Sequence, residues 1–454
     1  MEEVRIIAIK FLSFLGLHDY TLCTYELKDK SFTSRFVQEA LLEILGEEEE
    51  ETIEVVIFLT DEARESNWEK ENKHGKEGLS SILERLQQQN RIIVRDVRVP
   101  SKSDEEGIWE VFSIVIDQLK EEDEIIFDIT HSFRYQPMLA LLILHFAKVA
   151  FRTRIRGIFY GNIAASPKGE VPIAPITDLT PFIDLQDWVT NVYAFQESGR
   201  AESLYRFVYE KKEELVKQKV PHKEIQKMST IEKFTNKLYH LTMELETNRG
   251  PTIQTMAQKV LASLDHVQSD LPAQFQPIEI LLKRIEKKVE PLAHPDVIES
   301  GLAAISWCIQ HGLVEQAYTM LVEILVTAVC LVKGYSIEEA RDYDLREHYI
   351  SESLKVADLM LRGEKIEYRN PKVKELADKF ATNYTQMVNL YSSLKVDRND
   401  LNHAGWVKQP LEEDKFIERL VKPDPNQRDQ SNQAGKYLDL MEEIRNYWKE
   451  NKPE

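Results

Sequence analysis

The chain contains 454 residues, of which 43% are hydrophobic and 30% are charged, and it carries a formal net charge of −19. This length predicts more than one domain, because compact domains typically contain about 100 to 200 residues. The negative charge argues against a protein that coats nucleic acid nonspecifically, since neutralising phosphates requires a basic surface. A small basic cleft remains compatible with this composition.

The cysteines and the apolar segments indicate the cellular compartment of the protein. Cys23, Cys308 and Cys330 lie far apart and show no metal-ligand spacing, which favours a reducing compartment. The first residues show no basic segment followed by an apolar run, so no secretory signal is predicted. The apolar stretches 138–150 and 318–333 are interrupted by polar residues and fall short of the roughly 18 residues that a membrane span needs. We therefore expect a cytoplasmic protein that does not enter a membrane.

The first part of the chain alternates short β-branched runs with helical patterns. This alternation predicts a Rossmann-like α/β domain with a parallel sheet flanked by helices. The predicted strands are 4–15, 52–59, 91–99, 124–130 and 154–161. The predicted helices between them are 32–45, 79–89, 105–119 and 134–150. The proline-rich segment 162–181 is expected to be a loop, with at most one short extended piece, that leads to a domain boundary.

Helical periodicity then continues to the end of the chain. The predicted helices are 182–196, 203–214, 231–246, 252–269, 278–289, 296–310, 314–331, 371–394 and 434–448. The sequence therefore predicts an α/β domain at 1–181, a helical connector at 182–291 and a second helical domain at 292–454. The pattern leaves open whether the connector is a domain of its own.

The first candidate site lies where the fourth predicted strand ends, in segment 128–134. Ligands of open α/β sheets bind outside the carboxyl ends of the strands, where helix N-termini favour anionic groups. The first strand ends in the same way at 13–16, and Gly16 would let a ligand approach the backbone closely. We predict a ligand pocket formed by Ser13, Phe14, Leu15, Gly16, Thr130, His131, Ser132 and Arg134.

Simpler roles for this segment stay open. Thr130 or Ser132 could cap the following helix, and His131 could fill a loop. The first strand is not followed by a GxGxxG sequence, and the chain contains no GxxxxGK[ST] sequence. A standard dinucleotide cofactor or P-loop nucleotide therefore has little support.

The second candidate site is the segment 398–403. Cleavage of RNA without a metal requires a base for the 2′-hydroxyl, an acid for the leaving 5′-oxygen and a cation for the phosphate. One Arg398 and one His403 from each of two subunits could supply these groups, and Asn399 could position either of them. The chain shows no HExxH sequence or Cys/His cluster, so no metal is expected.

This second motif is short, and other interpretations compete with it. Arg398 could form a surface ion pair with Asp397 or Asp400, and His403 could cap a helix end. Arg341 and His348 match the same permissive spacing, so the spacing by itself is weak support for catalysis.

Taken together, the motifs resemble the CRISPR-associated effectors that join a CARF sensor domain to a HEPN ribonuclease domain, in the DxTHG branch. The resemblance covers most of the chain and rests on segments 13–16, 58–60, 128–134, 178–182 and 398–403. Ser132 stands where the family motif has Gly. Serine keeps a small side chain and adds a hydroxyl, so we expect ligand binding to survive, although ligand size or ligand breakdown could change.

The resemblance implies a homodimer or higher homo-oligomer in which two CARF domains form one pocket across a two-fold axis. It implies a symmetric allosteric activator, a cyclic oligoadenylate made by type III CRISPR complexes, with cyclic tetra-adenylate the expected ring and no other cofactor. Activator binding would rearrange two HEPN domains in which Arg398 and His403 cut single-stranded RNA and leave 2′,3′-cyclic phosphate ends. Stable DNA binding is not expected.

Two alternatives stay open at this point. The helical part could recruit a partner and never cut RNA, although the sequence shows no helix-turn-helix with a basic recognition helix. The sensor pocket could itself cleave the cyclic ligand, with hydroxyls of Ser13, Thr130 or Ser132 aligning it. The second alternative is compatible with RNA cleavage by the same protein.

Overall fold

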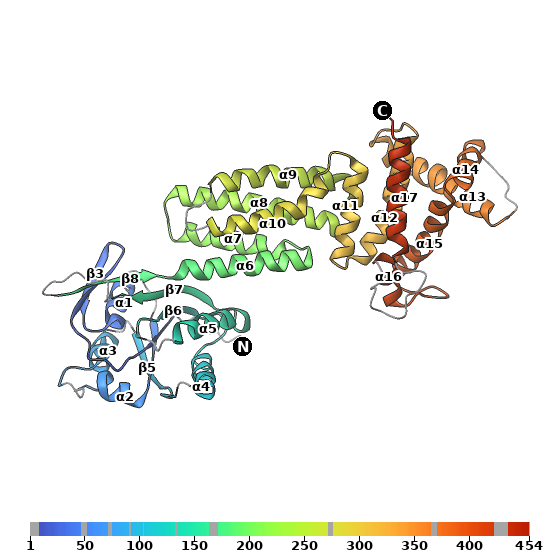
Figure 1. Ribbon diagram of the computed structural model, residues 1–454. Helices are drawn as coiled ribbons and strands as arrows, with labels where there is room; N and C mark the ends of the chain where they lie inside the picture. Colours follow the sequence, from blue (N-terminus) through green and yellow to red (C-terminus); the bar gives the residue numbers. More distant parts are fainter. Residues whose placement is uncertain are drawn as a thin grey trace, which may run out of the picture. The chain divides into compact units, whose positions relative to one another are not determined.

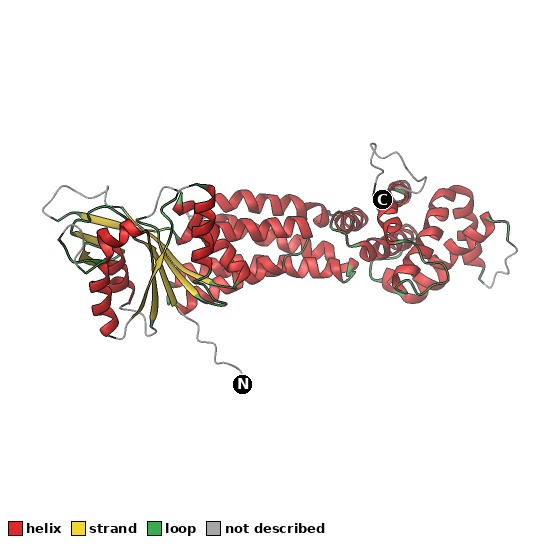
Figure 2. Cartoon of the chain, turned by 90° about the horizontal axis from the view of Figure 1, so that it is seen from below, coloured by secondary structure: helices red, strands yellow, loops and turns green. Residues whose placement is uncertain are grey.

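The computed structural model describes residues 9–46, 52–70, 75–89, 92–102, 104–131, 135–162, 171–270, 276–364, 370–421 and 435–453. The chain divides into two compact units, Met1–Gln186 and Asp187–Glu454. The described strands, yellow in Figure 2, all belong to the first unit, and the second unit is helical wherever it is described with regular structure. The predicted boundaries at 181/182 and 291/292 remain predictions.

Within the described residues, the first unit contains a sheet of eight strands in the order β3-β2-β8-β7-β6-β1-β4-β5. The run from β7 to β5 is parallel throughout. It consists of the five predicted strands, β1 (Ile9–Phe14), β4 (Ile53–Leu59), β5 (Ile92–Arg98), β6 (Glu124–Asp128) and β7 (Arg154–Gly161). The α/β prediction is therefore confirmed for the centre of the sheet, although residues 4–8 of the first predicted strand lie outside the described residues.

Three further strands make the sheet mixed rather than purely parallel. The hairpin of β2 (Cys23–Leu27) and β3 (Lys30–Ser34) is antiparallel, and β8 (Ile173–Asp178) pairs antiparallel with β7 and parallel with β2. The prediction of a helix from residue 32 was wrong at its start, because 32–34 belong to β3. Pro175 lies inside β8, where its carbonyl accepts the Asn162 N–H at 2.9 Å.

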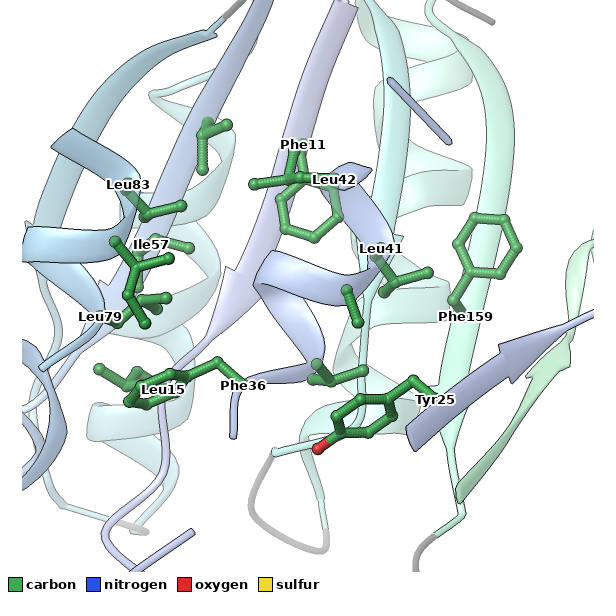
Figure 3. Close-up of a cluster of buried hydrophobic side chains, with 14 of the residues drawn as sticks. Phe11, Leu15, Tyr25, Phe36, Leu41, Leu42, Ile57, Leu79, Leu83 and Phe159 are labelled. Atoms are coloured by element: carbon green, nitrogen blue, oxygen red, sulfur yellow. The ribbon is translucent and has the colours of Figure 1, made fainter. Parts of the chain in front are cut away.

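Helices cover both faces of the parallel strands. The buried residues of α1 (Val37–Gly46) and α3 (Leu79–Gln88) form one hydrophobic cluster with β1 residues such as Phe11. Figure 3 shows Leu41, Leu42, Leu79 and Leu83 of this cluster beside Phe11 and Ile57. Residues of α4 (Glu105–Ile116) and α5 (Gln136–Ala150) form the second cluster with Leu12 and Phe14. Alternating side chains of β1 therefore enter two cores, as expected for a parallel strand covered on both faces.

The boundary between the two units falls within α6 (Thr180–Ser198), whose residues from Asp187 onward belong to the second unit. Its helices, green to red in Figure 1, are α7 (Glu202–Lys217), α8 (His222–Glu246), α9 (Gly250–Asp270), α10 (Gln276–Val289), α11 (Val297–Gln310), α12 (Val314–Val332), α13 (Glu352–Leu361), α14 (Pro371–Asn383), α15 (Thr385–Asn402), α16 (Glu413–Leu420) and α17 (Lys436–Asn451). The helical prediction for this part is confirmed.

That prediction was wrong in four details. The predicted helix 371–394 is two helices, because Tyr384 leaves helical geometry with φ −134° and ψ 40° between α14 and α15. The sequence pattern also missed α13, α16 and a π-helical segment, Asp344–Ser351. The eight residues of α16 and the ten of α13 offer too few turns for a clear helical period.

The apolar helix α12 has 19 residues, which is long enough by length and composition to cross a membrane. The expectation that this stretch falls short was wrong, because the helix begins four residues before the apolar run at 318–333. Inside the second unit α12 packs against α11, α15 and α17, and 56% of its apolar window is buried. This is the environment of a core helix.

Candidate functional site

A pocket of about 200 Å³ opens where the parallel strands of the first unit end. Because the carboxyl ends of parallel strands meet at one edge of the sheet, residues far apart in the sequence converge there. They come from the segments that follow β1, β4, β5 and β6. The pocket is lined by Phe14, Leu15, Gly16, Leu17, His18, Tyr20, Phe58, Thr60, Val99, Thr130 and His131.

The structure brings together five of the eight predicted ligand-binding residues. Phe14, Leu15, Gly16, Thr130 and His131 line the pocket, whereas Ser132 and Arg134 lie outside the described residues. Ser13 is fully buried and does not line the pocket. Its place in β1 directs its side chain away from that of Phe14, because successive side chains of a strand point to opposite faces.

Asp128 joins the strand ends beneath the pocket. Its buried carboxylate accepts hydrogen bonds from Ser13 Oγ at 2.7 Å, Thr130 N at 3.0 Å and Thr130 Oγ1 at 2.6 Å. Thr130 Oγ1 in turn accepts the Gly161 N–H at 2.8 Å. Burial raises the pKa of Asp128, while these hydrogen bonds favour its charged form. The interpretation of Thr130 as the cap of the following helix was wrong, because its hydroxyl donates to Asp128 at the end of β6 and accepts the N–H of Gly161 at the end of β7.

His131 presents an uncharged ring to the pocket. Burial, helped by the nearby charge of His18, lowers the pKa of His131 to about 4. Its Nε2 is buried and has no hydrogen-bond partner within the part of the chain that the structure describes. A neutral imidazole offers one donor and one acceptor. His131 is therefore suited to a polar group of a ligand, such as a base edge or a hydroxyl, rather than to neutralising a phosphate.

The sequence interpretation left several pocket residues out of the candidate site. Tyr20 stacks on His131, with ring centroids 4.2 Å apart, and Thr60 accepts the Ala63 N–H at 3.2 Å as the cap of the turn after β4. Leu17 and His18 are exposed at the pocket edge. The sequence pattern could have indicated Thr60 as a pocket residue, because segment 58–60 lies at the end of a predicted strand. No local pattern marks Tyr20 as a pocket residue.

The second candidate site lies at the C-terminal end of α15. The Arg398 side chain is 18% exposed, and its Nη1 lies 3.7 Å from Glu323 Oε1 on α12. Its Nε is buried without a hydrogen-bond partner in the described part of the protein. The remaining exposed part of the guanidinium is a cation that a phosphate could bind.

The predicted ion pairs of Arg398 with its acidic neighbours are not formed. Asp397 is buried and binds Arg419 and Tyr437, while Asp400 Oδ2 accepts the Leu411 N–H at 2.6 Å. That alternative was wrong, because both carboxylates face the interior of the unit instead of Arg398.

His403 is exposed and forms the C-cap of α15, with its N–H donated to Asn399 O at 3.0 Å. The capping role proposed for it is confirmed. Its ring remains accessible, and Asn399 is exposed as well. Five residues of α-helix rise by about 7.5 Å, so Arg398 and His403 lie about one and a half turns apart along one helix. One protomer thus supplies a cation and an imidazole near the same helix end.

The competing match, Arg341 and His348, has a different environment. Arg341 lies in a short 3₁₀ turn and pairs with Glu338 at 3.1 Å. His348 Nε2 lies 3.7 Å from Asp344 Oδ1 on the π-helical segment. Both side chains are exposed and paired with nearby carboxylates. Among the described residues, no group of three or more His, Cys, Asp or Glu side chains is placed to hold a metal ion.

Comparison with known proteins places the pocket in a recognised domain. Residues 10–163 match the family described as CRISPR system endoribonuclease Csx1, CARF domain. CRISPR-associated protein MJ1674 of Methanocaldococcus jannaschii is 33% identical over 101 residues, which make up 22% of this chain and 16% of that relative. The N-terminal prediction of a CARF domain is confirmed, and every residue that lines the pocket lies within the family match. Residues 164–454 lie outside it.

Proposed function

We propose that the chain is a type III CRISPR effector whose CARF domain binds a cyclic oligoadenylate and whose helical part is a HEPN ribonuclease. The observation that carries this proposal is the pocket at the strand ends, which lies wholly within the CARF match and contains the neutral His131, whose Nε2 has no hydrogen-bond partner among the described residues. Cyclic tetra-adenylate remains the expected activator, and single-stranded RNA the expected substrate.

The size of the pocket favours a ligand shared by two protomers. Its volume of about 200 Å³ is below the roughly 300–1,000 Å³ of typical small-molecule sites. A ring of four nucleotides cannot fit into one such pocket. Two copies around a two-fold axis would present two equivalent pockets to a symmetric ring.

The exposed face of α5 supports a homodimer of this kind. Met138, Leu142, Phe146 and Val149 follow one another at intervals of three or four residues on one side of the helix, and all are exposed. Apolar faces of this kind commonly mark protein interfaces. Since α5 follows the His131 segment, a second copy on this face would also adjoin the pocket.

For RNA cleavage, we propose that His403 and Arg398 of two protomers act on one phosphodiester. One His403 removes the proton from the 2′-hydroxyl, and the 2′-oxygen then forms a bond to phosphorus while the bond to the 5′-oxygen breaks. The second His403 donates a proton to that leaving oxygen. Arg398 stabilises the charge on the phosphate, Asn399 positions the reacting groups, and the product is a 2′,3′-cyclic phosphate.

The test is cleavage of a fluorogenic single-stranded RNA in EDTA, with and without cyclic tetra-adenylate or cyclic hexa-adenylate. We expect cleavage only with one of the rings, and a loss of at least about 100-fold in Arg398→Ala and His403→Ala. His348→Ala is the matched control, because it changes the other spacing match and should leave cleavage intact. Undiminished cleavage in His403→Ala would refute the site, and no cleavage with either ring would favour the regulator that recruits a partner.

For the alternative in which the pocket itself cleaves the ring, two of the three proposed hydroxyls are already hydrogen-bonded, while Ser132 lies outside the described residues. The hydroxyls of Ser13 and Thr130 both donate to Asp128, so neither is positioned to align a ligand for attack. Incubating His403→Ala with cyclic tetra-adenylate separates this activity from RNA cleavage, and we expect the ring to remain intact.

A further inference from the structure

Tyr20 contacts two walls of the pocket at once. Its buried hydroxyl accepts the Gly16 N–H at 2.8 Å, and its ring stacks on His131 at an interplanar angle of 34°. A β-carbon at Gly16 would lie 2.6 Å from the Tyr20 hydroxyl. The absence of a side chain at Gly16 thus makes room for Tyr20, in addition to any effect on the ligand. Tyr20 joins the segment after β1 to the segment after β6.

Asn67 holds the same segment from the other side. It belongs to the π-helical turn Arg64–Trp68, and its fully buried Nδ2 donates to Gly16 O and His18 O, both at 2.9 Å. One amide group that binds two carbonyls two residues apart fixes the path of the chain between them. Short π-helical insertions of this kind are frequent at functional sites.

Tyr20 and Asn67 make the buried contacts of this segment, whereas the exposed Asp19 pairs with Lys76 at 2.8 Å and with Arg35 at 3.8 Å. Leu17 and His18 line the pocket but are exposed, so their own burial contributes little to fixing it. A binding segment that is ordered before the ligand arrives avoids an entropic cost during binding. The contacts of Tyr20 and Asn67 provide that order in the absence of a ligand.

We infer that Tyr20 and Asn67 are positioning residues of the pocket, which hold Gly16, Leu17 and His18 and the His131 ring in the geometry that binds the cyclic nucleotide. This inference rests on the proposed function, since it assumes that the pocket takes that ligand. The inference concerns the affinity of the pocket for its ligand, and it gives neither Tyr20 nor Asn67 a catalytic role.

The experiment measures binding of cyclic tetra-adenylate and cyclic hexa-adenylate to the full-length protein by calorimetry at 20 °C. Tyr20→Phe removes one hydrogen bond and keeps the ring, so we expect about fivefold weaker binding. Asn67→Ala removes two hydrogen bonds and should weaken binding more than tenfold. Tyr20→Leu removes the stacking as well and should bind more weakly than Tyr20→Phe.

Tyr25→Phe is the matched control. The Tyr25 hydroxyl is buried in the same unit and has no hydrogen-bond partner among the residues described there, and we expect its removal to leave affinity unchanged. Binding is measured on folded protein well below its melting temperature. Substitution of a residue that only stabilises the fold would therefore lower Tm and leave the dissociation constant unchanged.

The outcomes are distinct. Weaker binding in Tyr20→Phe and Asn67→Ala, with Tyr25→Phe unchanged, supports the inference. Wild-type affinity in both variants overturns it and leaves the proposed function standing. If the wild-type protein binds neither ring, the proposed function is refuted, and the inference about Tyr20 and Asn67 is refuted as well. Should Asn67→Ala be insoluble, Tyr20→Phe decides alone.

Discussion

Arg398 Nη1 lies 3.7 Å from Glu323 Oε1, and the other carboxylate oxygen of Glu323 binds Arg346 Nη2 at 2.6 Å. Glu323 on α12 thus faces two arginines. Arg346 also donates to Thr327 Oγ1, Ala340 O and Glu323 O, so its position does not depend on the carboxylate alone. Glu323 is the carboxylate that lies within ion-pair distance of Arg398 among the described residues, so we expect it to orient the guanidinium.

Glu323→Gln should lower RNA cleavage because the proposed phosphate-binding Arg398 loses its charged partner. We expect kcat to fall about tenfold, equivalent to roughly 1.4 kcal/mol, without a rise in KM. Steady-state kinetics with saturating cyclic tetra-adenylate measures both constants. Lys395→Gln is the control, because Lys395 lies on the preceding turn of α15 and forms a 4.0 Å ion pair with Glu347 of the π-helical segment. A rise in KM at unchanged kcat would assign Glu323 to substrate binding alone.

Asp397→Asn should destabilise the helical unit. The buried carboxylate binds Arg419 at 2.5 Å and accepts the Tyr437 hydroxyl, and its loss leaves a largely buried arginine without a charged partner. Removing one member of such a pair costs about 3 kcal/mol. Urea unfolding monitored by circular dichroism measures the change. Asp344→Asn, at an exposed ion pair, should change stability by less than about 0.5 kcal/mol; equal effects of the two variants would contradict this assignment.

The CARF unit should lose stability as the pH falls from about 6.5 towards 4. The pKa of His131 is lowered to about 4 by burial and by His18, whereas the unfolded chain has the ordinary value of about 6.5. The unfolded state therefore binds the proton first, and the stability present above pH 6.5 is lost on acidification.

Urea unfolding at pH 7.5 and pH 5 tests this dependence. The wild type should lose about 2 kcal/mol more than His131→Asn between these values, because the variant lacks the titrating ring. The other groups near the ring, Tyr20 and His18, are unchanged in the comparison. Identical losses in both proteins would show that His131 is hydrated rather than buried.

Met138→Glu should prevent formation of the proposed homodimer and leave a monomer. The side chain is 72% exposed on α5, and a charge there would be buried without a partner in the proposed interface. Sedimentation velocity measures the change. Ile280→Glu, at a position 66% exposed on α10, is the matched control and should leave the dimer intact. A dimer that persists in Met138→Glu would move the interface to another surface.

The sequence analysis missed the hairpin of β2 and β3 and assigned the Ser13 side chain to the wrong surroundings, because both depend on neighbouring strands of the sheet. The hairpin of β2 and β3 contains charged and hydroxyl residues without a long apolar run, and these strands are fixed by their partners in the sheet. Ser13 was assigned to the pocket by its place at a strand end. Its side chain lies on the buried face, where it donates to Asp128 and accepts a hydrogen bond from Gln38 at 3.0 Å.

The sequence by itself determined the central parallel strands and the helices with long amphipathic patterns, because hydrophobic period is a local property of the chain. It also determined that 13–16 and 128–131 meet, since parallel strands bring their carboxyl ends to one edge. Only the tertiary structure decided which side chains face that edge, and it alone brought Tyr20, Asn67 and Glu323 to their partners. Those contacts join residues distant in sequence, and no local pattern encodes them.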